Sequence, residues 1–135
     1  MLVRNITSQI GENAGKIWQV IAAQGEVTME WLQSETKLSE KDVHAALGWL
    51  ARENKVKYDN GRYVLDATNL ENMIGSTAGK VYKILDIWEQ ADISTMKRLS
   101  EQSDEEIYAA LGWLAREDKI TVDTDRKLKL KSDSL

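Results

Sequence analysis

The sequence predicts a mainly helical chain with small β-hairpins (α+β), built from two tandem units of the same design. Three observations support this prediction. The nine residues AALGWLARE occur at 45–53 and again at 109–117, each copy lies in a segment with helical spacing, and each is followed by a stretch that reads as a hairpin. A chain of 135 residues suits either one ordinary domain or two small ones.

The repeat extends far beyond this string. When the chain is aligned with itself at an offset of 64 without gaps, residues 5–66 and 69–130 are identical at 19 of 62 positions. No Pro-rich or Gly/Ser-rich linker separates the copies, so we expect the two units to lie close together. We place the first unit at residues 1–66 and the second at residues 67–135.

Each unit is expected to open with a helix. Apolar residues at helical spacing predict helices over 13–23 and 77–88, and the string Ile-Gly-x-x-Ala-Gly-Lys, at 10–16 and 74–80, leads into each of them. Glycine inside a helix costs about 1 kcal/mol relative to alanine. Gly15 and Gly79 therefore indicate that the first helix of each unit packs tightly against a neighbour.

Two more helices follow in each unit. Thr28 and Asp92 are suitable N-caps for the second helix, and a serine begins the third. In the second copy, Ser103 and Glu106 match the capping-box pattern. These signals predict helices over 28–36, 39–54, 92–101 and 103–118.

A hairpin is expected to close each unit. Strands over 56–59 and 62–65 flank Asn60-Gly61, a dipeptide in which both residues tolerate a positive φ. Thr124-Asp125 takes this place in the second copy and forms tight turns less readily. We therefore expect a longer or looser second hairpin.

Three helices followed by a hairpin, in about 60 residues, is the order of a winged helix-turn-helix. The chain resembles a family of small prokaryotic winged helix-turn-helix proteins of uncharacterised function. The resemblance rests on Ile-Gly-x-x-Ala-Gly-Lys in the first helix and Ala-Leu-Gly-Trp-Leu-Ala-Arg-Glu in the third. It covers both halves, and what it implies is the fold; it supplies no catalytic residue and no ligand.

Residues that could carry chemistry are few. The Gly-rich segments 11–16 and 75–80 are one residue short of a phosphate loop and lack its Mg²⁺-binding hydroxyl. His44, the single histidine, aligns with Tyr108, which indicates a half-buried aromatic position and not an acid–base group. Without cysteine or a nucleophile–base set, we expect no enzyme, no cofactor, no metal site and no small-molecule ligand.

The same composition bears on the compartment. The chain has no cysteine, no apolar signal-peptide region at its start, and no apolar run long enough to span a bilayer. We therefore expect a cytoplasmic protein with no membrane partner.

Nucleic-acid binding is the first functional hypothesis. A winged helix usually lays its third helix in the major groove and its wing on the backbone. The outward face of that helix centres here on Ala45 and Gly48, and on Ala109 and Gly112, which donate nothing to a base edge. The net charge is −4, yet cations gather near the wings. We therefore expect weak, salt-dependent, sequence-nonspecific binding of duplex DNA. The candidate contacts are Lys41, Arg52, Lys55, Lys57, Arg62, Arg116, Lys119, Arg126, Lys127 and Lys129.

The alternative hypothesis is a protein-interaction or assembly module without DNA binding. An Ala-x-x-Gly helix face lets another backbone approach closely, and the neighbouring tryptophans add area to bury. The proposed contact face comprises Ala45, Gly48, Trp49, Ala109, Gly112 and Trp113. It would join the two units to each other or to a second copy of the chain, unless the glycines are remnants of duplication and the tryptophans ordinary boundary packing.

Overall fold

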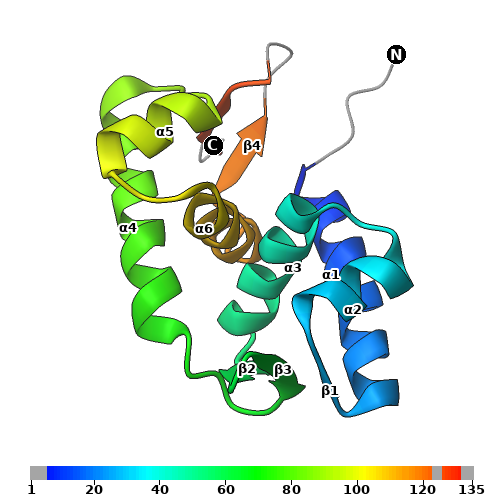
Figure 1. Cartoon of the computed structure of the whole chain (residues 1–135). Helices are drawn as coiled ribbons and strands as arrows, with labels where there is room; N and C mark the ends of the chain where they lie inside the picture. The colour runs from blue at the N-terminus through cyan, green and yellow to red at the C-terminus, as the bar shows by residue number, and fades with distance from the viewer. Residues whose placement is uncertain (1–5, 123–125, 132–135) are drawn as a thin grey trace, which may run out of the picture.

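The computed structural model of the chain describes residues 6–122 and 126–131. The first unit comprises α1 (Ile6–Gln24), β1 (Glu26–Val27), α2 (Met29–Thr36), α3 (Glu40–Arg52), β2 (Val56–Asp59) and β3 (Arg62–Leu65). The second comprises α4 (Glu71–Trp88), α5 (Ile93–Ser100), α6 (Asp104–Arg116), β4 (Ile120–Val122) and β5 (Leu128–Leu130). This order confirms tandem winged helix-turn-helix units, mostly helical and with small antiparallel sheets (Figure 1).

The predicted caps begin the shorter helices. Thr28 and Asp92 each accept a hydrogen bond from the backbone N–H three residues further on, over 3.1 and 2.8 Å. Ser103 and Glu106 form the complete capping box, with reciprocal bonds of 3.2 and 3.1 Å. Local sequence therefore determines where these helices start.

The third helices end two residues earlier than expected. α3 ends at Arg52 and α6 at Arg116, and Asn54 and Asp118 follow with left-handed φ values of 60° and 58°. A residue in that conformation cannot continue a right-handed helix. Asparagine and aspartate tolerate it better than most residues do.

The first helices start earlier than expected, at Ile6 in place of 13 and at Glu71 in place of 77. The added turns carry Ile10 and Ile74, which are buried in the core of the opposite unit. Our prediction missed these turns because their apolar residues face the other unit and not the helix's own core. Each unit therefore completes the core of the other.

The packing expected of Gly15 and Gly79 is wrong. Both glycines are exposed, and a Cβ built on either would meet nothing within 4 Å outside its own helix. The close contact lies one turn earlier. A Cβ on Gly11 would lie 3.0 Å from the Trp49 ring, and one on Gly75 would lie 3.4 Å from the Trp113 ring.

The first sheet has three strands in the order β1-β3-β2. β2 and β3 pair from Val56 opposite Leu65 to Asp59 opposite Arg62. Asn60 and Gly61, with φ values of 51° and 78°, make the tight turn between them. The turn expected of Asn-Gly is confirmed.

The second hairpin is longer. β4 stops at Val122 and β5 resumes at Leu128, and Leu128 also bridges to Ala91, which lies where β1 does in the first unit. The expected turn residues, Thr124 and Asp125, lie outside the described residues.

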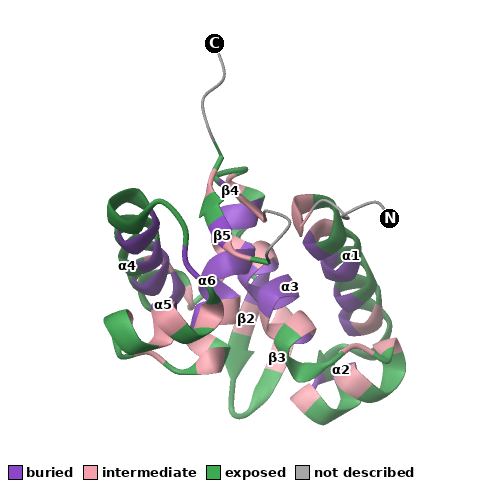
Figure 2. Cartoon of the chain, turned by 90° about the horizontal axis from the view of Figure 1, so that it is seen from above, coloured by how far each residue is buried: buried purple, intermediate pink, exposed green. Residues whose placement is uncertain are grey.

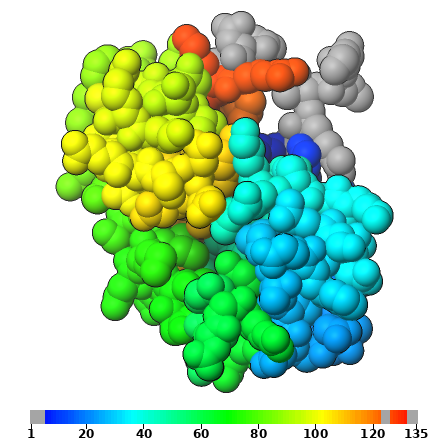
Figure 3. All heavy atoms as spheres, viewed as in Figure 1, coloured from blue at the N-terminus to red at the C-terminus, as the bar shows by residue number. Residues whose placement is uncertain are grey.

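α3 and α6 lie side by side in the middle of the molecule (Figures 1 and 2). α1 and α2 flank them on one side, α4 and α5 on the other, and the two hairpins lie at opposite ends. The buried residues gather on the inward faces of these helices, and the two units meet across the middle (Figures 2 and 3). Among the described helices, none has both the length and the apolar character needed to cross a bilayer.

Candidate functional site

The two copies of AALGWLARE pack against each other where α3 and α6 cross. A Cβ added to Gly48 would lie 2.7 Å from the carbonyl carbon of Ala109 and would overlap its oxygen. A Cβ added to Gly112 would overlap the carbonyl of Ala45 in the same way. Both alanines are less than a tenth exposed. The proposed reading faces of the third helices are therefore in contact with each other.

Tryptophan and arginine side chains frame this crossing. The Arg52 guanidinium lies 5.4 Å from the centre of the Trp113 ring, and that of Arg116 lies 5.7 Å from the Trp49 ring. Cations at this distance are attracted to the face of an indole ring. Both tryptophans are half-buried and pack against the cores of both units.

Ion pairs link the ends of the two strings. Arg52 Nε donates to Glu117 over 3.1 Å, and Arg116 Nε donates to Glu53 over 2.9 Å. These pairs exchange under the offset of 64 that relates the two copies. Because the contact is nearly two-fold, each residue type has to be present on both helices, and this accounts for the identical strings.

The cations predicted to bind DNA have several intramolecular partners besides these. Lys55 lies 3.6 Å from Glu53, Lys119 lies 3.4 Å from Glu117, and Arg62 lies 2.9 Å from Glu26. Lys41 lies over the Tyr108 ring. The remaining candidates are in or beside the two hairpins, at Lys57, Arg126, Lys127 and Lys129.

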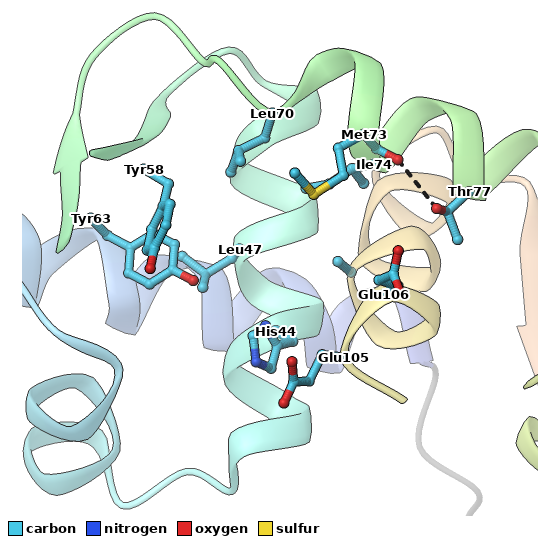
Figure 4. Close-up of a pocket in the computed structure, with 11 residues that line it drawn as sticks. His44, Leu47, Tyr58, Tyr63, Leu70, Met73, Ile74, Thr77, Glu105 and Glu106 are labelled. Carbon is cyan, nitrogen blue, oxygen red and sulfur yellow. Dashed lines mark hydrogen bonds between the residues drawn. The ribbon is translucent and has the colours of Figure 1, made fainter. Parts of the chain in front are cut away.

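A pocket of about 200 Å³ lies between the units, beside this crossing (Figure 4). We call it the inter-unit pocket. It is bounded by the first hairpin, α3, the start of α4 and the start of α6. Its apolar walls are Leu47, Tyr58, Tyr63, Leu70, Met73 and Ile74. No local sequence pattern indicates this pocket, because its lining is brought together only by the crossing of the two units.

Acidic groups lie at one end of the pocket. His44 and Glu105 lie next to each other at this end (Figure 4), and Glu40 lies 3.8 Å from the His44 imidazole. Within the described part of the chain, these three could ligate one metal ion, since their ligand atoms all lie within 4.8 Å of one another. The nearby Glu106 accepts from Ser103 instead, in the capping box.

The surroundings of the pocket change the pKa of one of its tyrosines, Tyr63. Burial is the largest of the causes that together raise the pKa of Tyr63 to about 12, and nearby Tyr58, Glu105 and Glu40 add to it in that order. The tyrosinate would be poorly solvated and would face two carboxylates. The pocket therefore disfavours additional negative charge.

The corresponding place in the second unit is occupied by a cation of the chain itself. Lys41, which aligns with Glu105, lies 5.7 Å from the centre of the Tyr108 ring, where the first unit has His44. Lys97 binds Asp104 over 2.8 Å, and this hydrogen bond lowers the pKa of Asp104, with a smaller contribution from Lys41. The two halves thus differ in charge at matching positions.

Comparisons with known proteins agree with this architecture. The model of the winged helix-turn-helix domain family DUF2582 matches residues 5–65 and again residues 70–131. An uncharacterized protein of Methanocaldococcus jannaschii, MJ1608, is 43% identical over 63 residues, which are 43% of this chain and 90% of that protein.

One solved structure is also similar to this chain. It is the mRNA-binding domain of elongation factor SelB from E. coli in complex with SECIS RNA, with a TM-score of 0.41 and 14% identity. The match covers 90% of this chain and 98% of that one. The family match covers most of the sequence. The chain therefore belongs to the DUF2582 winged helix-turn-helix family and carries two copies of its domain.

Proposed function

We propose that this chain is a non-catalytic binding module that recognises a protein partner, with the inter-unit pocket as its contact site. The observation that carries the proposal is the burial of Ala45 and Gly48 against Ala109 and Gly112. A winged helix that reads sequence inserts this face of its third helix into the major groove. Neither α3 nor α6 has that face free.

The charges of the described residues support a partner other than a polyanion. The chain carries a net charge of −4. At least five of the ten candidate DNA contacts have a carboxylate within 4 Å among the described residues, which weakens their attraction for phosphate. These are Arg52, Lys55, Arg62, Arg116 and Lys119.

The walls of the pocket have the composition of a protein interface. Tyrosine and methionine are enriched at such interfaces, where they supply large apolar contact areas. Met73 is 60% exposed and Tyr58 is 43% exposed, although both side chains line the pocket. A protein partner would remove this apolar surface from water.

Site-specific photo-crosslinking in native cell extract tests the proposal. A photoreactive phenylalanine analogue at Met73 should give discrete adducts that protease removes and nuclease leaves intact. The same analogue at Asp86, an exposed position elsewhere on α4, is the matched control. Adducts at Met73 that are digested by nuclease, or equal protein adducts at both positions, would overturn the proposal.

Nucleic-acid binding through the wings is the second candidate. It is favoured by Lys57, Arg126 and Lys129 in or beside the hairpins, for which the described residues provide no ion pair. With the third helices unavailable, such binding would contact phosphates alone and would not depend on sequence.

A titration with a mixed-sequence duplex, followed by tryptophan fluorescence, tests this candidate. Three phosphate contacts predict that the logarithm of the binding constant falls with that of salt with a slope of about −2.7. Replacing Lys57, Arg126 and Lys129 with glutamate should abolish the binding. Binding that is independent of salt, or that persists after these replacements, would show that the wings are not the nucleic-acid contact site.

A further inference from the structure

We propose that the inter-unit pocket takes a lysine or arginine side chain of the partner. This inference rests on the proposed function and names the group that the site recognises. A volume of about 200 Å³ is below the roughly 300–1,000 Å³ of pockets that hold drug-sized ligands. It suits one long side chain.

The walls match the two parts of such a side chain. Leu47, Met73 and Ile74 offer an apolar surface to its methylene stem, and Tyr58 and Tyr63, whose ring centroids lie 4.8 Å apart, line the hairpin side of the pocket. Long cationic side chains bury their stems on apolar surfaces while the charged end keeps polar partners. An aromatic face also attracts that charged end.

The polar end of the pocket lacks a cation. Its described lining residues include two glutamates and a histidine but no lysine or arginine. Glu105 is exposed and forms no ion pair with any residue that the structure describes, and among those residues Glu40 pairs only with the His44 imidazole. A cationic group entering here would complete this set of charges.

The second unit shows such a cation in place. There Lys41 extends from α3 and lies over the ring of Tyr108 on α6. Under the internal repeat, Lys41 corresponds to Glu105, and Tyr108 corresponds to His44. At the position that matches this ammonium group, the inter-unit pocket has the carboxylate of Glu105. The comparison indicates a place for a cation supplied from outside the chain.

Proton NMR provides a direct test, because the ring signals of the single histidine report on the pocket. The probe is Gly-Lys-Gly blocked at both ends, and Gly-norleucine-Gly is its control with the same stem and no charge. We expect the lysine peptide to shift the His44 signals at concentrations at least tenfold below those needed for the norleucine peptide. Salt should weaken the effect.

A pair of variants sharpens the test. Glu105→Lys supplies the chain's own cation and should reduce binding of the lysine peptide at least tenfold. Asp86→Lys makes the same charge change on α4, away from the pocket, and should leave binding within twofold. Thermal melting of both variants checks that they fold, and the comparison of the two peptides on the wild-type protein needs no variant.

Three results would overturn the inference. Equal binding of both peptides would show that charge is not recognised. Unchanged binding in Glu105→Lys would place the peptide elsewhere. Shifts of the His44 signals by micromolar zinc chloride, with none caused by the lysine peptide, would make this a metal site. In each case, protein adducts at Met73 would still support the proposed function, so the two proposals fail separately.

Discussion

The two copies are identical where α3 and α6 cross, and they differ at the N-terminal ends of the same helices. At the crossing, Gly48 and Gly112 make equivalent contacts, and the two sequences are identical over nine residues. At the ends, Glu105 faces His44 in one half, and Lys41 lies over Tyr108 in the other. A two-fold contact imposes the same requirement on both copies, whereas the helix ends face different surroundings. Identity therefore indicates the contact, and divergence indicates where the surroundings of the two halves differ.

The largest effect is expected at the crossing. Gly48→Gln should destabilise the fold by at least about 3 kcal/mol, because the side chain would meet the backbone of Ala109, which cannot move aside as a flexible side chain can. Urea unfolding measures the loss. Gly15→Gln is the matched control: it fills open space on an exposed helix face and should stabilise by about 0.5 kcal/mol. Equal effects of the two variants would contradict a close contact.

The effect of the pocket on the ionisation of Tyr63 should be measurable in an alkaline titration. The pKa of Tyr63 is about 12 and exceeds the ordinary value of 10.0, so the folded state resists its ionisation. The stability that this contributes is complete below pH 10 and is lost as the pH rises through about 12. Tyrosinate absorbance measures the transition, which Tyr63→Phe should remove and Glu105→Gln should move to lower pH. Titration of Tyr63 near pH 10 would show that this wall is open to water.

A smaller difference should separate the two first helices. Gly11→Ala places a methyl group 3.0 Å from the Trp49 ring, whereas Gly75→Ala places one 3.4 Å from the Trp113 ring. Alanine gains up to about 1 kcal/mol of helix propensity at either position. We expect Gly75→Ala to keep most of this gain in thermal unfolding and Gly11→Ala to lose it. The opposite order would mean that Trp49 shifts more easily than Trp113.

The ion pairs should contribute least. A double-mutant cycle on Arg52 and Glu117 should give a coupling of about 0.2–1 kcal/mol, since the arginine is 44% exposed. The cycle on Arg116 and Glu53 should give a similar value, and both should shrink at high salt. A coupling that appears in one pair only would show that the contact is less symmetric than its sequence.

The fold was largely predictable from the sequence because its signals are local. Caps at Thr28 and Ser103 and the turn at Asn60 act within a few residues, and the repeat doubled the evidence for each element. The early turns of α1 and α4 were missed because Ile10 and Ile74 pack in the opposite unit. A pattern of apolar residues that is interpreted within one unit does not reveal contacts with the other unit.

The site was harder to predict. The repeated string indicated a contact face around Gly48 and Gly112, and those residues are indeed brought together. The pocket depends on residues as far apart as His44 and Glu105, which come from different units. Their proximity follows from the crossing geometry of two helices, and no local pattern encodes that geometry.

The short connection between Leu65 and Glu71 has a consequence for stoichiometry. A chain carrying a single unit could bury its Ala-x-x-Gly face only by pairing with another molecule, so its folding would depend on concentration. The covalent tether makes the encounter intramolecular, at an effective concentration on the order of millimolar. A homodimer would also have to present two identical pockets or none. Only the fused chain can carry Lys41 at one place and Glu105 at the matching place, so it should bind one partner per molecule.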